Sequence, residues 1–385
     1  MVGKKAKKEE RKDEGSELPL IFLNYCGVAP LHGSGARAIA SCASAFENWQ
    51  GPLSVYQDSV IRVRNAAAKL LQVPVNTVAF VQNSAHGLNV IAHGLRLNEG
   101  DEILSYRFEY PSNHYPWAIQ ELRGVRLTTF KGQVNGGRPH LFTVDDVREA
   151  ITPRTRVLAV SHVQFTSGFT ASLEALGEVC RERNIVFVVD AAQSVGVIPV
   201  HPSQFGADAL VTSGWKWLRG PVGSGFLYVS ERLMGELDDI WVGPDMMQQG
   251  ENYLDHRIQP FSDARRYHFS TLPVFSTVGL AAALEDHLRQ GEDRVLWERL
   301  QQRQGHLIER LARLGFGLVR LPEGARAGVL SFNTGKVDPR ACVTALGEQN
   351  VVCSSRGGYL RFAPHHDTKV DDLDEAVERI ERVMG

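Results

Sequence analysis

The sequence lacks an apolar run long enough to cross a membrane. A spanning helix needs about 18 or more consecutive apolar residues, and no such run occurs in the 385 residues. Residues 1–17 also lack the apolar core of a secretion signal and instead mix Lys and Arg with Asp and Glu. We therefore expect no membrane partner and a disordered charged tail over residues 1–17.

The sequence also lacks a strong excess of basic or of acidic residues. Lys and Arg number 42 and Asp and Glu number 44, which gives a formal net charge of −2. Dedicated nucleic-acid-binding proteins usually carry a strong basic excess, so we expect no nucleic-acid partner. The first predicted strand is not followed by G-x-G-x-x-G, which disfavours a dinucleotide-binding protein.

Cysteine is scarce, and the cysteines do not form a paired sequence motif. The five cysteines are odd in number and none forms a C-x-x-C pair: Cys26, Cys42, Cys180, Cys342 and Cys353. This excludes a disulfide scaffold and a structural zinc site, and it is typical of a reducing cytoplasm. The adjacent His365 and His366 would point to opposite faces of a strand, so we expect no metal site there either.

Short apolar runs that alternate with helix-like stretches dominate the rest of the chain. The runs are residues 77–81, 102–106, 125–130, 156–160, 185–189, 209–212 and 225–229. Runs such as 186–189 are continuously apolar, as expected for strands whose two faces are both covered by helices. We predict an α/β fold with a mostly parallel seven-stranded sheet.

The pattern of predicted helices and strands changes after residue 275. Two long helices, over 276–288 and 296–314, precede strands at 329–332 and 359–362 and an amphipathic terminal helix. We expect a large domain over 50–275 and a smaller α+β domain over 276–385. Residues 18–49 are expected to form an N-terminal segment that packs on the smaller domain.

Two residues of opposite charge follow neighbouring predicted strands. Asp190 directly follows the strand at 185–189, and Lys216 follows the strand at 209–212. In open α/β sheets, ligands gather beyond the carboxyl ends of the strands. Alone, Asp190 could be a helix cap and Lys216 a surface residue, but together they predict one site.

The motifs around these two residues resemble a known family. The sequence D-A-A-Q-S at 190–194, followed by S-G-W-K-W at 213–217, resembles fold-type I pyridoxal-phosphate enzymes of the class V aminotransferase group, which includes cysteine desulfurases. The resemblance implies an aspartate-aminotransferase-like fold and bound pyridoxal 5′-phosphate. Lys216 would form a Schiff base and act as the base at Cα, Asp190 would keep the pyridine nitrogen protonated, and Gln193 would contact the ring 3-oxygen.

The resemblance also implies contacts to the phosphate and to the ring face. Ser84, Ala85 and His86 stand at the start of a predicted helix, where free N–H groups bind anions, and Ser213 would add a hydroxyl. Tyr110 occupies the place of the ring that stacks on the cofactor, where desulfurases carry His.

Substrate and partner contacts follow by the same resemblance. Arg361 would bind the α-carboxylate of a small amino acid, with Asn24 and Arg356 as weaker candidates for the same pocket. Thr271 matches a threonine that reaches the phosphate of the partner subunit, so we expect a homodimer with shared active sites. Phe165 departs from the Asn that several relatives carry.

The sequence also bears on the reaction. A persulfide-forming desulfurase needs a cysteine on the loop before Arg361, and residues 354–358 contain none. Transamination needs only Lys216 to move a proton, so we expect an aminotransferase. A C–S lyase acting on cysteine or cystine is the alternative, followed by an amino-acid epimerase. The intact set of Lys216, Asp190 and Arg361 disfavours a scaffold without activity.

Overall fold

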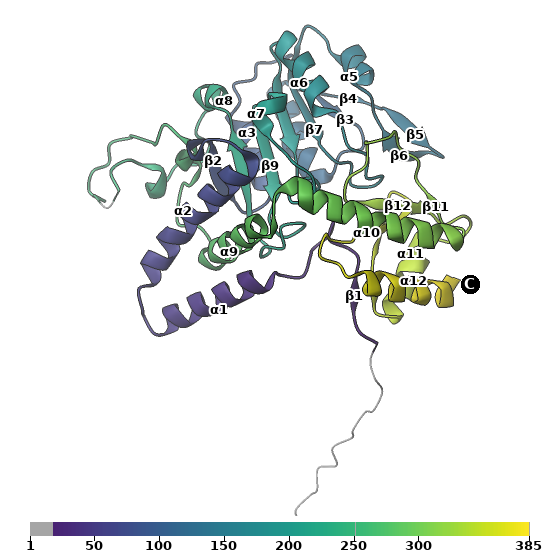
Figure 1. Cartoon of the computed structure of the whole chain (residues 1–385). Coiled ribbons are helices and arrows are strands. Elements are labelled where there is room, and N and C mark those ends of the chain that lie inside the picture. The colour runs from purple at the N-terminus through teal and green to yellow at the C-terminus, as the bar shows by residue number, and fades with distance from the viewer. Residues whose placement is uncertain (1–17, 251, 385) are drawn as a thin grey trace, which may run out of the picture.

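A computed structural model describes residues 18–250 and 252–384 (Figure 1). The tail expected over residues 1–17 lies outside the described residues. Within them, no helix combines the length and the apolar character that a membrane span requires.

A seven-stranded sheet forms the centre of the fold. Its order is β2 (Val78–Val81), β10 (Gly225–Val229), β9 (Ala209–Ser213), β8 (Val186–Asp190), β7 (Thr155–Ser161), β3 (Glu102–Tyr106) and β4 (Arg126–Phe130). Strand β10 runs antiparallel to both neighbours, and every other neighbouring pair is parallel. The predicted mostly parallel sheet is therefore confirmed.

Helices cover both faces of this sheet, which explains the continuously apolar strands. In β8, Phe187 and Val189 face one core and Val186 and Val188 face the other. The first core is closed by α2 (Pro52–Leu71), α5 (Val144–Ala150), α6 (Leu173–Glu182) and α9 (Val274–Gln290). The second is closed by α3 (Ser84–Gly94), α4 (Tyr115–Ala118) and α8 (Glu231–Glu236).

A smaller sheet follows in the C-terminal part. Its order is β11 (Gly317–Leu318), β12 (Leu330–Asn333), β15 (Tyr359–Phe362) and β14 (Ser354–Arg356), all antiparallel. It packs with α10 (Asp293–Arg313), α11 (Pro339–Glu348) and α12 (Val370–Met384) around a separate core. Strand β1 (Ile21–Phe22) pairs in parallel with β13 (Val351–Val352).

The domain boundaries stay a prediction. Helix α9, assigned from the sequence to the C-terminal domain, contributes Leu280 and Leu284 to a core of the large sheet. The shorter elements β5 (Gln133–Asn135), β6 (Arg138–Leu141) and α7 (Pro202–Phe205) complete the fold.

Helix α1 (Gly33–Glu47) was not expected from the sequence. Its first turns contain Gly and Ser, which are poor helix formers in isolation. A Cβ atom at Gly35 would lie 3.1 Å from the carbonyl oxygen of Gly279 in α9, so the two helices approach closely there. Packing against α9 therefore stabilises a helix that its own composition does not favour.

Candidate active site

A cavity of about 800 Å³ lies at the carboxyl ends of the parallel strands. Strands β2, β3, β7, β8 and β9 all end at this edge, because they run in the same direction. All predicted site residues line the cavity except His86 and Thr271.

Asp190 and Lys216 face this cavity from neighbouring strand ends. Asp190 is buried, and its Oδ1 accepts the N–H of Ala192 at 2.9 Å. Burial raises the pKa of Asp190, although the charge of Lys216 opposes the shift. Burial also lowers the pKa of Lys216, against the opposing charge of Asp190. A lysine whose pKa is lowered presents more of the free amine, which is the nucleophilic form.

Tyr110 stands over the amine of Lys216. The Nζ atom of Lys216 lies 5.6 Å from the centroid of the Tyr110 ring. Phe165 meets the Tyr110 ring edge-on, with centroids 5.2 Å apart. The two aromatic rings therefore form an apolar wall on one side of the cavity.

The start of α3 offers an anion site. Asn83 caps the helix by accepting the N–H of His86 at 2.8 Å, and the N–H groups of Ser84 and Ala85 have no acceptor among the described residues. The hydroxyls of Ser84 and Ser213 lie 2.9 Å apart beside them. Free N–H groups and hydroxyls at a helix N-terminus fit the phosphate of pyridoxal phosphate.

Two predicted contacts are not brought to the cavity. The Nδ1 atom of His86 accepts the N–H of Gln82 at 3.3 Å, and its ring packs 5.0 Å from that of Trp241. The imidazole therefore turns away from the anion site. Thr271 is exposed and lies outside the cavity lining.

Gln193 is fixed by two contacts within the protein. Its Nε2 donates to the carbonyl oxygen of Cys26 at 2.9 Å, and its Oε1 accepts Nε1–H of Trp217 at 3.0 Å. One amide N–H remains for the predicted contact to the ring oxygen. The Cys26 side chain lines the same cavity, and sequence reasoning did not assign it to the site.

Arg361 is a buried cation without a carboxylate partner among the described residues. Its side chain is 3% exposed. Its Nε and Nη2 donate to Oγ of Ser354 at 3.2 and 3.0 Å, and Nη1 donates to the Phe165 carbonyl. Ser354 in turn donates to Oδ1 of Asn24 at 2.9 Å. An unpaired buried charge is costly, so this geometry favours an anionic ligand in the cavity.

The remaining substrate candidate, Arg356, stands at the edge of the cavity. It is exposed, and its Nη1 donates to the carbonyl oxygen of Ser355 at 2.8 Å. It lies on β14, opposite the start of β15, and Arg361 lies further along β15. Arg356 can therefore meet a ligand only at the rim of the cavity.

Glu109 and Ser161 were missed by sequence reasoning. The Glu109 carboxylate accepts the N–H of Ser161 at 2.7 Å and also its hydroxyl. Burial raises the pKa of Glu109 to about 7, although the two Ser161 donors oppose the shift. The position of Glu109 just before Tyr110 was the available signal, but its contact to β7 is visible only in the fold.

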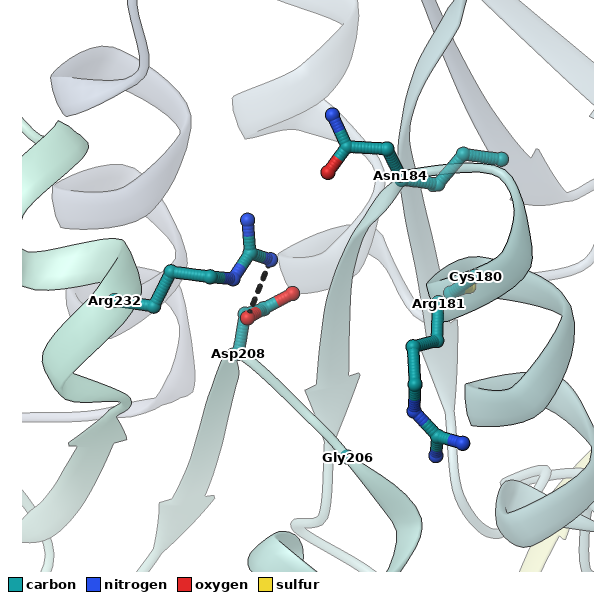
Figure 2. A pocket seen from close by; sticks show the side chains of 7 residues that line it. Cys180, Arg181, Asn184, Gly206, Asp208 and Arg232 are labelled. Atoms are coloured by element: carbon teal, nitrogen blue, oxygen red, sulfur yellow. Dashed lines mark ion pairs between the residues drawn. The ribbon is translucent and has the colours of Figure 1, made fainter.

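A second hollow, of about 300 Å³, lies at the opposite edge of the sheet (Figure 2). It is at the amino ends of β8 and β9, and Arg232 pairs there with Asp208 at 2.7 Å. Arg181 also lines the hollow but is exposed to water, so the described lining of the hollow has no buried, unpaired cation of the kind found at Arg361. The described residues also contain no group of three side chains that could hold a metal ion.

Known proteins resemble the chain over nearly its whole length. A probable cysteine desulfurase of Methanothermobacter thermautotrophicus is 26% identical over 413 aligned positions, covering 97% of this chain and 98% of the relative. The cysteine desulfurase IscS of Photobacterium profundum is 24% identical, covering 94% and 92%.

Solved structures show the same fold. A mutant of C-DES with glycine covalently linked to its PLP cofactor superposes with a TM-score of 0.86 at 24% identity, covering 94% of this chain and 97% of that one. The cysteine desulfurase of Thermococcus onnurineus NA1 gives 0.83 at 20% identity, covering 99% of each chain.

The sequence profile of the family described as "Aminotransferase class-V" matches residues 54–366. This span contains the anion site at α3, Asp190, Lys216 and Arg361. The residues expected from the sequence to contact the cofactor and the substrate therefore lie within the matched span, apart from Asn24. The chain therefore belongs to the class V aminotransferase family, and its cofactor is pyridoxal 5′-phosphate.

Proposed function

We propose that this enzyme cleaves a C–S bond in cystine or cysteine, in place of the transamination expected from the sequence. The observation that supports an amino-acid substrate is the environment of Arg361. This buried cation has no carboxylate partner among the described residues, and it lines the same cavity as Lys216. The choice of C–S cleavage is supported by the names of the relatives, which are cysteine desulfurases and the cystine C–S lyase C-DES.

Several residues of the cavity have a part in this proposal. Bound pyridoxal phosphate supplies an electron sink for the Cα carbanion. Ser84, Ala85 and Ser213 hold its phosphate, and Asp190 accepts the pyridine N–H. Lys216 removes the Cα proton of the substrate, since its lowered pKa provides a free amine.

The hairpin before Arg361 favours cystine over cysteine. Strands β14 and β15 are joined by Gly357 and Gly358 alone, with φ of 56° and 81°. Two left-handed residues make a tight turn, so no loop is present there to carry a cysteine. Cys353, next to β14, is buried, and burial raises its pKa to about 12. A thiol in that state is a poor nucleophile.

Cystine needs no protein thiol. Loss of the Cα proton and cleavage of the Cβ–S bond of cystine release the anion of cysteine persulfide, a better leaving group than the hydrosulfide that cysteine would release. With one water molecule, cystine then yields cysteine persulfide, pyruvate and ammonia. Arg361 holds the α-carboxylate in place while these bonds change.

The test is an incubation of the holoenzyme with L-cystine, L-cysteine and L-alanine, each with and without a keto acid. We expect pyruvate, ammonia and persulfide in equal amounts from L-cystine. A new amino acid formed from the keto acid without sulfur release would contradict the proposal and favour transamination. An inverted amino acid would favour epimerisation.

The Lys216→Ala variant is the control. It removes both the amine that binds the cofactor aldehyde and the base at Cα, so product formation and the visible cofactor absorbance of the lysine adduct should disappear together. Product formation that survives this substitution would contradict the role of Lys216.

A homodimer in the cytoplasm remains part of this proposal. Thr271 is exposed and away from the cavity of its own chain, which leaves it available to a neighbouring subunit. All five cysteines are free and buried, as is usual in a reducing compartment.

A further inference from the structure

The side chain of His365 lies between two hydrogen-bond acceptors. It follows β15 and is 3% exposed. Its Nε2 is 3.0 Å from the carbonyl oxygen of Trp217, and its Nδ1 is 2.6 Å from Oδ1 of Asp367. A neutral imidazole carries one N–H and one lone pair, so it can donate to only one of these oxygens. Only the doubly protonated ring donates to both.

Asp367 is held in its charged form. Its Oδ2 accepts Nη1–H of Arg219 at 2.6 Å. The guanidinium of Arg219 favours the carboxylate form of Asp367, so the proton between Asp367 and His365 resides on Nδ1 of the ring. The contact of Nε2 to the carbonyl oxygen of Trp217 then requires a second proton on the ring.

The other groups around the ring do not replace this arrangement. The titratable and charged groups that face it or its immediate partners are Tyr25, His32, Arg219, His366, Asp367 and Asp372. The Tyr25 ring stacks on His365 at 4.8 Å, and the His366 ring lies at 4.0 Å. Burial raises the pKa of Tyr25 and lowers the pKa of His366, so both are neutral.

We propose that His365 is a positioning residue that carries a proton on each ring nitrogen and so ties the turn of Lys216 to the C-terminal segment. Trp217 is held through its carbonyl oxygen, and Arg219 is held through Asp367. The N–H of Arg219 donates to the carbonyl oxygen of Lys216 at 3.0 Å, and Arg219 has a left-handed φ of 54°. The contacts of His365 and Asp367 therefore hold Trp217 within this turn and Arg219 at its end.

The clamp requires a proton on both ring nitrogens. A ring with a single proton would keep the bond to Asp367 and turn a lone pair toward the carbonyl oxygen of Trp217. Two facing acceptors repel, so the turn loosens and Lys216 is held less firmly. That Lys216 is the reactive lysine rests on the function proposed above, whereas the protonation of His365 does not.

The first measurement is a long-range ¹H–¹⁵N spectrum of the ¹⁵N-histidine-labelled holoenzyme near neutral pH. The signals that disappear in His365→Phe identify the residue. We expect both of its nitrogens to show the shifts of a protonated ring. A shift of one nitrogen typical of a lone pair would overturn the inference.

The second measurement is amide hydrogen exchange of Arg219 and Gly220, whose N–H groups donate to Lys216 and Gly214. Loss of one such contact should speed exchange about fivefold. We expect this in Asp367→Asn, which keeps the side-chain shape and also serves if His365→Phe does not fold. Unchanged exchange would overturn the clamp.

The matched control is Asp374→Asn. Asp374 also contacts a histidine and an arginine, His306 at 2.8 Å and Arg310 at 2.5 Å, but it lies on α12. Exchange at Arg219 and Gly220 should stay unchanged in this variant, and acceleration there would count against a specific role of His365. Neither measurement depends on turnover, so failure of the clamp would leave the proposed reaction untouched.

Discussion

At the scale of single residues, the site is built from charges that the fold removes from water. Asp190, Lys216 and Arg361 all face one cavity, and burial opposes the charged form of each. The cost is offset when a ligand supplies the missing partner. Substitution of one of these three residues should therefore change ligand binding more than substitution of another residue that lines the cavity.

Replacement of Arg361 by Gln should separate substrate binding from cofactor binding. The amide keeps polar contacts to Ser354 but cannot form a charged fork with a carboxylate. We expect KM for the amino acid to rise by about two orders of magnitude, since loss of one partner of a buried charged pair costs several kcal/mol. Steady-state kinetics and the cofactor content of the purified variant provide the readouts.

Cofactor content should be unchanged in that variant. Equal loss of cofactor and substrate binding would instead indicate that Arg361 supports the fold.

Glu109 should make stability depend on pH. Its folded-state pKa of about 7 lies above the ordinary 4.5. The folded chain therefore binds this proton more tightly, and the resulting stability is present below about pH 4.5 and lost as pH rises to 7. Glu109→Gln resembles the protonated form, so it should flatten this part of the pH profile. Denaturant unfolding at several pH values measures it.

An identical pH profile for Glu109→Gln and the parent protein between these values would contradict the assignment. Asp145→Asn is a suitable control, because that carboxylate is exposed on α5.

At the scale of elements, close approach between segments decides where helices can lie. In α6, a Cβ atom at Gly177 would lie 1.7 Å from the carbonyl oxygen of Phe205 in α7. In α10, a Cβ atom at Gly305 would meet nothing within 4 Å. The two glycines occupy the same kind of helical backbone but differ in what surrounds them.

These two glycines give a matched pair of alanine variants. Gly177→Ala should lower the free energy of unfolding by about 1–3 kcal/mol or more, because the backbone of α7 must shift. Gly305→Ala should raise it by up to about 1 kcal/mol, since alanine favours helix. Chemical denaturation of both variants measures the difference, and equal effects would contradict the packing argument.

At the scale of the whole molecule, exposed apolar groups are consistent with the proposed dimer. Residues 241–250 and 252–261 extend away from the large sheet (Figure 1), and they expose Tyr253 at 72%, Leu254 at 90% and Ile258 at 82%. Exposed apolar side chains that cluster in this way are typical of interaction surfaces.

Subunit mixing tests whether Thr271 serves the neighbouring site. Thr271→Val and Lys216→Ala should each impair activity alone. In a mixed dimer, a site with an intact Lys216 would receive an intact Thr271 from the other subunit, so activity should return on mixing under exchange conditions. Persistent inactivity of verified mixed dimers would place Thr271 at its own site or outside any site.

Most of the large sheet could be predicted because each strand carries a local signal. Continuous apolar runs such as 186–189 mark strands buried on both faces, and all seven runs correspond to strands of the sheet. Helix α1 lacked such a signal, because its stability comes from contact with α9, which lies far along the chain.

The cofactor and the family follow from residues close in sequence, since the motifs around Asp190 and Lys216 are local. The charge state of the site cannot be predicted in this way, because it depends on distances between segments that are far apart in the chain. The isolation of Arg361 from any described carboxylate, the turn of His86 away from the anion site, and the placement of His365 between Trp217 and Asp367 arise only when packing brings those segments together.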